Sequence, residues 1–270
     1  YHPFTLVIDP NLRVLTVIPF RAGQDHGDAV AGFLKDLPPP GLHAGLATPA
    51  PVLVMPRIFE PEFCRDLIQY YQAQGGQDSG FMREVEGRTV GVIDYSHKRR
   101  SDCLISDPAL KAGALQRIVR RLIPEIQKAF QFRATRLERY IVACYETEPG
   151  GYFRPHRDNT TKGTAHRRFA VTINLNAGDY EGGDLRFPEF GPQTYRAPTG
   201  GAVVFSCSLL HEAMPMTRGT RYAFLPFLYD DAAARQREEN AQFLAEGLPK
   251  YRADAGVPAP EPQGVPGEPA

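Results

Sequence analysis

The stretch Tyr145-Glu-Thr-Glu-Pro-Gly-Gly-Tyr-Phe-Arg-Pro-His156-Arg-Asp158-Asn159 ends in a His-x-Asp pair. In a β-strand, residues i and i+2 point to the same face, so His156 and Asp158 can direct an imidazole and a carboxylate to one point. His211 offers a second imidazole further along the chain. Two nitrogens and one oxygen on one face suit a divalent iron that keeps its other positions open. The sequence therefore predicts His156, Asp158 and His211 as ligands of one iron site.

Each part of this pattern has an ordinary alternative when it is taken alone. A single His-x-Asp pair usually marks a solvated loop, and a single histidine is more often a core residue with satisfied hydrogen bonds. Arg221, which follows His211 by ten residues, favours the metal site over these alternatives. Its guanidinium is a fixed cationic fork that can grip a carboxylate with two hydrogen bonds.

Several runs beyond the His-x-Asp pair share a known family pattern. They are Phe169-Ala-Val-Thr-Ile-Asn-Leu-Asn176, Glu181-Gly-Gly-Asp-Leu-Arg-Phe187, Gly200-Gly-Ala-Val-Val-Phe205, His211-Glu-Ala-Met-Pro215 and Arg221-Tyr-Ala-Phe-Leu-Pro-Phe227. With the opening stretch, these runs resemble the Fe(II)/2-oxoglutarate-dependent dioxygenase superfamily, in particular its prolyl-4-hydroxylase-like branch. The resemblance covers about residues 56–230. It implies a mainly β fold with supporting helices, built on a double-stranded β-helix (jelly-roll) core.

The resemblance also implies a reaction. Fe(II), 2-oxoglutarate and O2 would be the cofactor and co-substrates, with L-ascorbate as a reductant, and a C–H bond would be hydroxylated with release of succinate and CO2. Arg221 would hold the far carboxylate of 2-oxoglutarate, although many prolyl-hydroxylase-like members use lysine there. Related halogenases lack the carboxylate ligand, so Asp158 favours hydroxylation. The expected substrate is a prolyl or other amino-acid residue, free or in a peptide.

Most of the other candidate site residues have two possible roles. Tyr145 could orient 2-oxoglutarate or be a half-buried strand tyrosine. Asn174, in an apolar strand, could face the co-substrate or satisfy backbone groups nearby. Phe187 is expected to form an apolar wall. Arginines crowd the region at Arg99, Arg100, Arg154, Arg157, Arg167 and Arg168. They form either a solvated basic rim or a receiving surface for an acidic or peptide substrate, for which Arg99, Arg100, Arg154 and Arg168 are the candidates.

Composition limits the classes of function. The chain has 270 residues, of which 42% are hydrophobic and 23% charged, so it can bury a substantial core. Lys+Arg and Asp+Glu balance at 31 each, so no overall field attracts nucleic acid or an anionic membrane. No apolar run approaches the roughly 18 residues that span a bilayer. The four scattered cysteines indicate reduced thiols, which favours a cytoplasmic protein.

The positions of the proline- and glycine-rich stretches predict that the chain is divided into five segments. Residues 1–40 are expected to form a β-hairpin and a helix, which resemble the last part of a thioredoxin-like domain; a hairpin packed on the main domain is the alternative. A linker over 41–55 leads to the dioxygenase domain at 56–232. Its helices are expected to begin near Pro61 and Pro108, the second one kinked or divided at Pro124. A helix over 233–248 and a disordered tail over 249–270 complete the chain.

Two other functions stay open at this point. A nucleic-acid demethylase on the same fold is disfavoured by the zero net charge and by the absence of a dense basic and aromatic track. A non-catalytic jelly-roll binding module is disfavoured because all three iron ligands and the arginine are present. The oligomeric state leaves no signature in the sequence.

Overall fold

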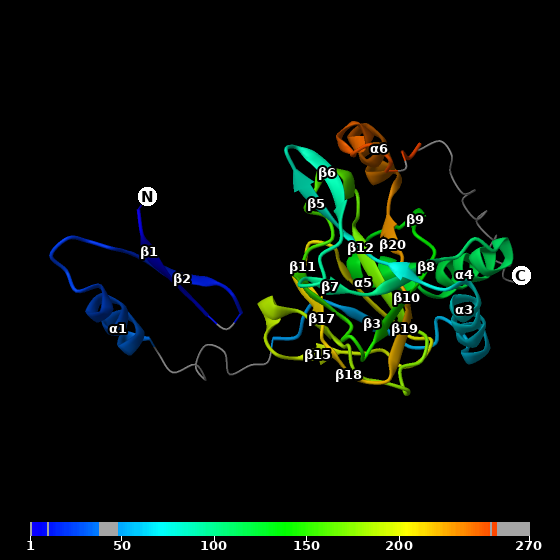
Figure 1. The fold of residues 1–270 in the computed structure, drawn as a ribbon, viewed down its shortest axis with the longest axis horizontal. Coiled ribbons are helices and arrows are strands. Elements are labelled where there is room, and N and C mark those ends of the chain that lie inside the picture. The colour runs from blue at the N-terminus through cyan, green and yellow to red at the C-terminus, as the bar shows by residue number, and fades with distance from the viewer. Residues whose placement is uncertain (1, 10, 38–47, 249, 253–270) are drawn as a thin grey trace, which may run out of the picture.

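The computed structural model describes residues 2–9, 11–37, 48–248 and 250–252, and two β-sheets dominate its main body (Figure 1). The larger sheet has the order β3 (Leu53–Met55), β16 (Ala202–Ser206), β12 (Phe169–Asn174), β19 (Thr220–Phe224), β10 (Ile141–Glu146), β8 (Ser101–Leu104), β4 (Gln77–Asp78), with β20 (Phe227–Tyr229) and β9 (Arg136–Glu138) attached. The smaller sheet has the order β15 (Thr194–Tyr195), β14 (Leu185–Arg186), β17 (His211–Ala213), β11 (Tyr152–His156), β7 (Lys98–Arg99). The pairings in both sheets are antiparallel, and the predicted jelly-roll fold is confirmed.

Three helices cover the outer face of the larger sheet: α3 (Pro61–Gln74), α4 (Pro108–Arg121) and α5 (Ile123–Phe130). The Asp107 side chain caps α4, with a proline in the next position, as predicted. Pro124 lies in the first turn of α5, where its missing N–H costs no hydrogen bond, so the predicted long helix is divided at Leu122.

The sheet–helix interface holds the main hydrophobic core. Phe59 is almost fully buried, with its ring centroid 5.0 Å from that of Phe63 and 5.5 Å from that of Phe224. Strand β10 has a second apolar face, on which Ala143 and Tyr145 pack between the two sheets. A strand buried on both faces reads as continuously apolar, which is how its run Ile-Val-Ala-Cys-Tyr appears in the sequence.

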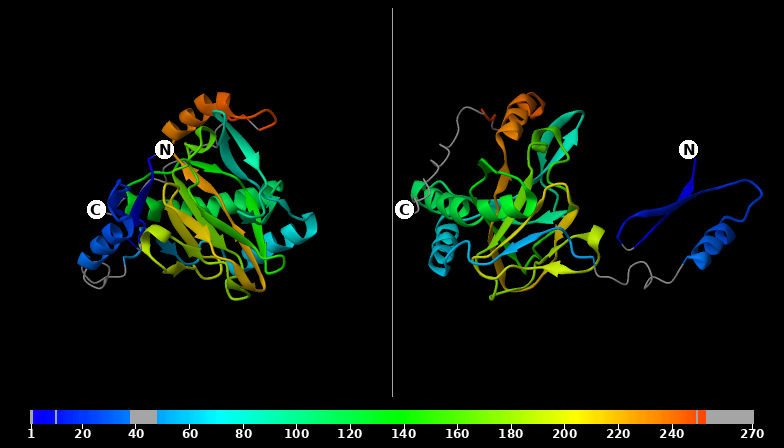
Figure 2. Two further views of the ribbon diagram at one scale, coloured as in Figure 1. Left: turned by 60° about the vertical axis from the view of Figure 1, so that its left-hand side comes forward. Right: turned by 180° about the vertical axis from the view of Figure 1, so that it is seen from behind.

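One hairpin, a further pair of strands and three short 3-10 turns complete the described part of the main body. Strands β5 (Phe81–Val85) and β6 (Arg88–Val92) project beside the last helix, α6 (Figures 1 and 2), and β13 (Glu181–Gly182) pairs with β18 (Met216–Arg218). The 3-10 turns are η1 (Lys162–Thr164), η2 (Pro188–Phe190) and η3 (Asn240–Phe243).

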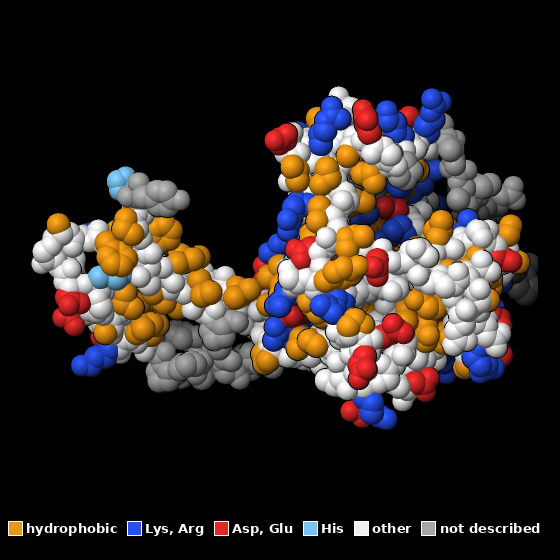
Figure 3. Space-filling model, in the orientation of Figure 1, with side chains coloured by type: hydrophobic (Ala, Val, Ile, Leu, Met, Phe, Trp, Pro, Cys, Tyr) orange, Lys and Arg blue, Asp and Glu red, His pale blue; other side chains and the backbone are white. Residues whose placement is uncertain are grey.

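The N-terminal hairpin and helix are present: β1 (Phe4–Ile8), β2 (Val14–Pro19) and α1 (His26–Asp36). Figure 3 shows hydrophobic side chains gathered over this unit, among them Phe4 and Phe20, each more than half exposed. The resemblance to part of a thioredoxin-like domain stays a prediction. Most of the predicted linker, residues 38–47, lies outside the described residues.

The C-terminal helix is shorter than predicted. Helix α6 spans Asp231–Glu239 and gives way to the 3-10 turn η3 at Asn240. Its buried residues are the alanines 233 and 234, so packing holds its first turns and leaves the later polar residues without an apolar stripe. The predicted tail lies outside the described residues except for positions 250–252.

Candidate metal centre and its cavity

Three of the predicted residues converge between the two sheets. His156, Asp158 and His211 offer one ligand atom each, and these atoms lie within 4.8 Å of one another. The Nε2 atoms of His156 and His211 lie 3.6 and 3.4 Å from the two carboxylate oxygens of Asp158. An ion with bonds of about 2.0–2.2 Å to nitrogen and oxygen fits among donors at this separation.

The strand geometry differs from the sequence expectation in one respect. Strand β11 ends at His156, and the β11–β17 register is irregular between Phe153 and His156. Asp158 therefore lies in the turn after the strand, where its N–H donates to the Cys207 carbonyl at 3.0 Å. That hydrogen bond, instead of a continued strand, turns the carboxylate toward the histidines.

Both imidazoles are held by the same local arrangement. The Nδ1 of His156 lies 2.8 Å from the carbonyl of Arg154, and the Nδ1 of His211 lies 3.0 Å from that of Leu209. A carbonyl accepts a hydrogen bond from Nδ1–H, so in each neutral ring the lone pair is on Nε2, which faces Asp158. The donor set therefore fits a divalent cation.

Aromatic rings and charge reinforce this arrangement. Phe153 stacks on His156 with ring centroids 3.4 Å apart, and Phe205 lies 4.5 Å from His211. Burial, together with His156, lowers the pKa of His211 to about 4, which keeps this ring neutral at pH 7. Burial would raise the pKa of Asp158, but His211 and His156 hold it below its usual range, so the carboxylate stays charged.

Arg221 lies on β19, directly opposite Tyr145 of β10 in the strand register. The side chain is buried, and its Nη1 donates to the Gly183 carbonyl at 2.7 Å. Its Nε is buried and has no hydrogen-bond partner. Gly183 has φ +65°, and a Cβ there would lie 2.5 Å from the Met216 Sδ and 3.2 Å from the Arg221 Cδ, so a glycine at this turn leaves room for both side chains.

One cavity of about 780 Å³ joins the two parts of the site. It is lined by His156, Asp158 and His211 as well as by Arg221 and Tyr145. The Tyr145 ring lies 5.0 Å from the Arg221 guanidinium, and Arg100 donates to its hydroxyl at 3.4 Å. Both arginines thus flank a tyrosine that the sequence could assign either to the site or to the core.

Asn174 does not reach the cavity. Its amide donates to the Ala197 carbonyl at 2.8 Å, and its oxygen lies 3.5 Å from the Nη2 of Arg221. The hydrogen bond to Ala197 agrees with the second of the two interpretations of the sequence, in which Asn174 satisfies a backbone group. Asn174 supports Arg221 from behind.

Four other sequence candidates lie outside the lining of this cavity. Arg99 donates to the carbonyls of Tyr95 and Pro149 beside a smaller pocket, and Arg154 donates to the Ser96 carbonyl at 2.6 Å. Arg168 is held by the Ala165 carbonyl and the Gln236 side chain of α6. Phe187 is buried behind His211, with ring centroids 6.2 Å apart, so it forms core and no exposed wall. Of the four arginines proposed to receive the substrate, Arg100 alone lines the cavity, and Arg157 and Arg167 of the wider arginine group line it as well.

The structure adds cationic residues that sequence reasoning missed or left without a role. Lys98 is buried, and its Nζ donates to Ser79 Oγ at 2.7 Å and to the Gly80 carbonyl at 2.6 Å. Arg139 and Arg167 line the same cavity. Strand alternation from Arg100 could have placed Lys98 on the same face, but nothing local marks Arg139.

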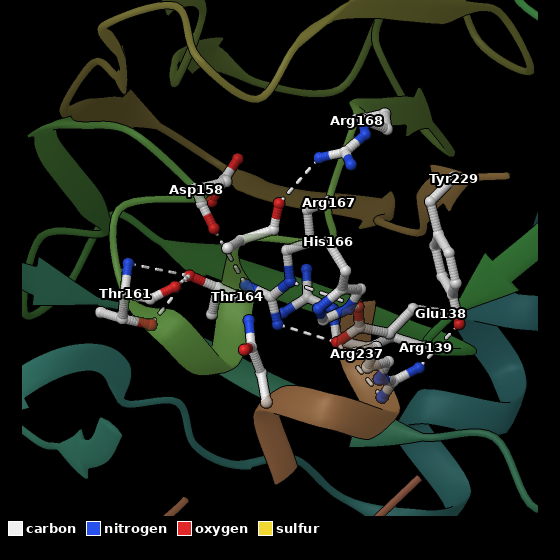
Figure 4. Close-up of polar contacts among 12 residues, drawn as sticks. Glu138, Arg139, Asp158, Thr161, Thr164, His166, Arg167, Arg168, Tyr229 and Arg237 are labelled. Carbon is white, nitrogen blue, oxygen red and sulfur yellow. Dashed lines mark hydrogen bonds and ion pairs between the residues drawn. The ribbon is translucent and has the colours of Figure 1, made fainter. Parts of the chain in front are cut away.

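Glu138 is the centre of a buried polar network beside the metal centre (Figure 4). Its carboxylate accepts hydrogen bonds from Arg167 at 2.8 Å and from His166 at 2.7 Å, and the Nη2 of Arg237 lies 3.7 Å away. Arg167 also donates to the Asp158 carbonyl at 3.4 Å. The network therefore connects strand β9 and helix α6 with the loop that carries Asp158.

Comparison with known proteins gives the site a family context. The family model of the 2OG-Fe(II) oxygenase superfamily matches residues 140–229, the span that contains all three converging residues and Arg221.

Curated relatives are PKHD-type hydroxylases. The protein from Synechococcus sp. (strain JA-3-3Ab) is 34% identical over 89 residues, which are 31% of this chain and 39% of that protein. The protein from Shewanella sp. (strain ANA-3) is 27% identical over 184 residues, 66% of this chain and 77% of that protein. The chain thus spans about two fifths of the length of the first of these relatives.

Solved structures share the fold. A Pseudomonas putida prolyl-4-hydroxylase matches with TM-score 0.50 and 18% identity, over 67% of this chain and 93% of its own. A prolyl hydroxylase from Trichoplax adhaerens, in complex with a hypoxia-inducible-factor peptide fragment, matches with TM-score 0.52 and 15% identity, over 80% and 96%. At these identities the likeness concerns the fold alone.

Proposed function

We propose that this chain is a 2OG-Fe(II) oxygenase that hydroxylates a C–H bond of a prolyl or other amino-acid residue. Its match to the family model, its fold and its three converging residues support this proposal. The observation that carries the proposal is the meeting of two imidazole nitrogens, one carboxylate and an arginine fork in one cavity. Other folds combine two of these features by chance. All four together match the needs of an iron centre with a bound oxoacid.

His156, Asp158 and His211 would hold Fe(II), and Arg221 would bind the distal carboxylate of 2-oxoglutarate. With these groups and O2 bound, the centre supplies the oxidation that converts 2-oxoglutarate to succinate and CO2 and a substrate C–H to C–OH. One oxygen atom goes to succinate and the other to the substrate. The chain's own part is to orient the ligands through Arg154 and Leu209 and to exclude water through the Phe153 and Phe205 rings.

Ascorbate is proposed as the reductant that keeps the iron divalent, and the cytoplasm as the location, in keeping with four free buried cysteines. No helix in the described part of the chain is long and apolar enough to cross a membrane. A small molecule or a peptide is proposed as the substrate.

The experiment that tests this function is an anaerobic titration of the protein with Fe(II) and then 2-oxoglutarate, followed by O2 and detection of succinate. Binding of both, and succinate that increases with candidate amino acids or peptides, would support an oxygenase. Tight 2-oxoglutarate binding without any succinate would instead indicate a binding module.

Arg221→Lys should weaken 2-oxoglutarate binding by about 1–3 kcal/mol, because lysine keeps the charge but loses the fork. Fe(II) affinity should change little, since Arg221 is not one of the three residues that would hold the metal. Calorimetric titration of each ligand measures both effects. Arg218→Lys is the matched control, because Arg218 is an exposed residue on β18 paired with Glu181. An equal loss of Fe(II) and 2-oxoglutarate affinity would show that the variant disturbs the fold.

A further inference from the structure

Arg139 is a basic residue of the cavity wall. It follows strand β9 with φ +70°, a backbone conformation that turns the chain into β10. Its Nη2 donates to the Leu225 carbonyl at 3.3 Å, while its Nε is buried and has no partner. Among the described residues, Arg139 forms no ion pair. The Leu225 carbonyl replaces only part of the hydration that this guanidinium loses in the cavity wall.

The two carboxylates that act electrostatically on Arg139 each form an ion pair with another arginine. Glu138 is bound by Arg167 and His166, and Asp102 is bound by Arg100 at 2.6 Å. The Phe227 ring lies 4.2 Å from the Arg139 guanidinium and 4.0 Å from that of Arg167, so the two cations share one aromatic surface. Glu138 and Asp102 act electrostatically on Arg139, but neither forms an ion pair with it among the described residues.

Two further basic side chains belong to this wall, and burial holds the pKa of the Lys98 side chain well below its usual value of 10.5. Lys98 and Arg100 line the same cavity, and Asp102 is the carboxylate that acts electrostatically on both and on Arg139. Lys98 has hydroxyl and carbonyl partners and no carboxylate partner among the described residues. Asp102 is thus the acid that these three basic side chains share, while Glu138 also acts on Arg139 and Asp158 also acts on Lys98. Burial and the neighbouring Arg167 and Arg100 lower the pKa of Arg139 to about 10, which leaves it charged at neutral pH.

We propose that Arg139, with Lys98 and Arg100 beside it, forms an oxyanion subsite that binds a carboxylate or phosphate of the substrate. The inference rests on the proposed function, in which 2-oxoglutarate occupies Arg221, so a second unpaired arginine in the same cavity is left for the substrate. A guanidinium fork presents parallel N–H groups to such an oxyanion. The substrate class is therefore acidic: a free amino or imino acid, a peptide with an acidic group near the reacting carbon, or a phosphorylated molecule.

The test compares N-acetylproline with N-acetylprolinamide, which differ by one carboxylate, and adds inorganic phosphate as a third probe. Binding to the full chain is measured by calorimetry, both without metal and with Zn(II) and saturating 2-oxoglutarate, which fill the proposed metal and Arg221 sites without turnover. The Nε–H resonance of Arg139 is followed by NMR. We expect the acid to bind at least about tenfold more tightly than the amide and to shift this resonance. Binding of phosphate with the same shift would extend the subsite to phosphorylated substrates.

Arg139→Gln should remove the preference for acid over amide, and Arg139→Lys should retain part of it. Arg154→Gln is the matched control, since Arg154 lies outside the cavity lining and should keep the wild-type preference. Arg221→Gln should keep it as well. Thermal unfolding of each variant checks that the fold is intact.

The outcomes separate this inference from the proposed function. If neither acid nor phosphate binds the wild type, or if Arg139→Gln retains the full preference, the subsite is wrong even when 2-oxoglutarate binds normally. If the preference for acid over amide depends on Arg221 and not on Arg139, the anion binds at the proposed 2-oxoglutarate site. That result would also contradict the proposed subsite at Arg139. Failure of Zn(II) or 2-oxoglutarate binding would count against the proposed function alone, because the metal-free titrations still report on Arg139.

Discussion

Asp158→Ala is expected to lower substrate-dependent succinate formation by more than about 100-fold. Mutation of groups that merely orient metal ligands costs about 10–100-fold in affinity or activity, so the loss of a ligand should exceed that range. The variant keeps both imidazoles but removes the negative charge within 3.4–3.6 Å of them. Fe(II) should still bind, though more weakly, and succinate assays at saturating Fe(II) measure the remaining turnover.

Asp66→Ala serves as the matched control, because Asp66 is an exposed carboxylate on α3, away from the cavity lining. It should match the wild type in both Fe(II) affinity and turnover. Unimpaired turnover of Asp158→Ala would exclude Asp158 as an iron ligand.

The same position distinguishes hydroxylation from halogenation. Asp158→Gly would leave room for chloride beside the metal, yet we expect it to lose turnover and to give no chlorinated product, because an open position does not by itself direct a halide to the substrate. Mass spectrometry of reactions run with and without chloride measures this. A wild type that requires chloride and releases a chlorinated substrate would contradict the assignment of Asp158 as a ligand.

The site residues that could be predicted from the sequence combine a chemically distinctive side chain with a short spacing to a partner. His156 and Asp158 are two positions apart, and Arg221 is ten beyond His211, so each prediction needed a residue type and a nearby partner. The structure brings these four residues to one cavity. The helices near Pro61 and Pro108 were equally predictable, because proline and aspartate at a helix start act through their own backbone geometry.

What the sequence could not place depends on contacts between distant segments. Asn174 ends strand β12 and Phe187 follows strand β14, and strand alternation gives two faces but does not tell which face borders the cavity. Phe187 packs on Phe205 behind His211, and Asn174 packs behind Arg221. Arg139 reaches the cavity because β9 pairs with β20, some ninety positions further along the chain. No periodicity within either strand encodes that pairing.

Glu138 also acquires its role from distant segments, since its partners come from positions 166, 167 and 237. Its side chain is only 9% exposed. Burial would raise the pKa of Glu138, but Arg167 and His166 hold it well below the usual value of 4.5. The carboxylate is therefore charged in the folded protein at neutral pH, and it neutralises cations that have little access to water.

Glu138→Gln is expected to destabilise the protein by about 3–5 kcal/mol, because glutamine keeps the shape but leaves Arg167 and Arg237 without their counter-charge. Urea unfolding of the metal-free protein at pH 7 measures this, with an unchanged m-value as evidence that the same surface unfolds. Glu181→Gln is the matched control. Glu181 and Arg218 are both more than 60% exposed, and an exposed pair of this kind contributes about 0–1 kcal/mol.

The effect of Glu138 should also depend on pH in one direction. A carboxyl group whose pKa is lower in the folded state than in the unfolded state stabilises the fold above its unfolded pKa, and this stabilisation is lost as the pH falls toward the folded pKa. The difference between wild type and Glu138→Gln should therefore be complete at pH 7 and should shrink below about pH 4.5, the ordinary carboxyl value. A difference that stays constant or grows in acid would mean that Glu138 is protonated in the folded protein, and that the Asp158 loop is held by neutral hydrogen bonds instead of a buried charge network.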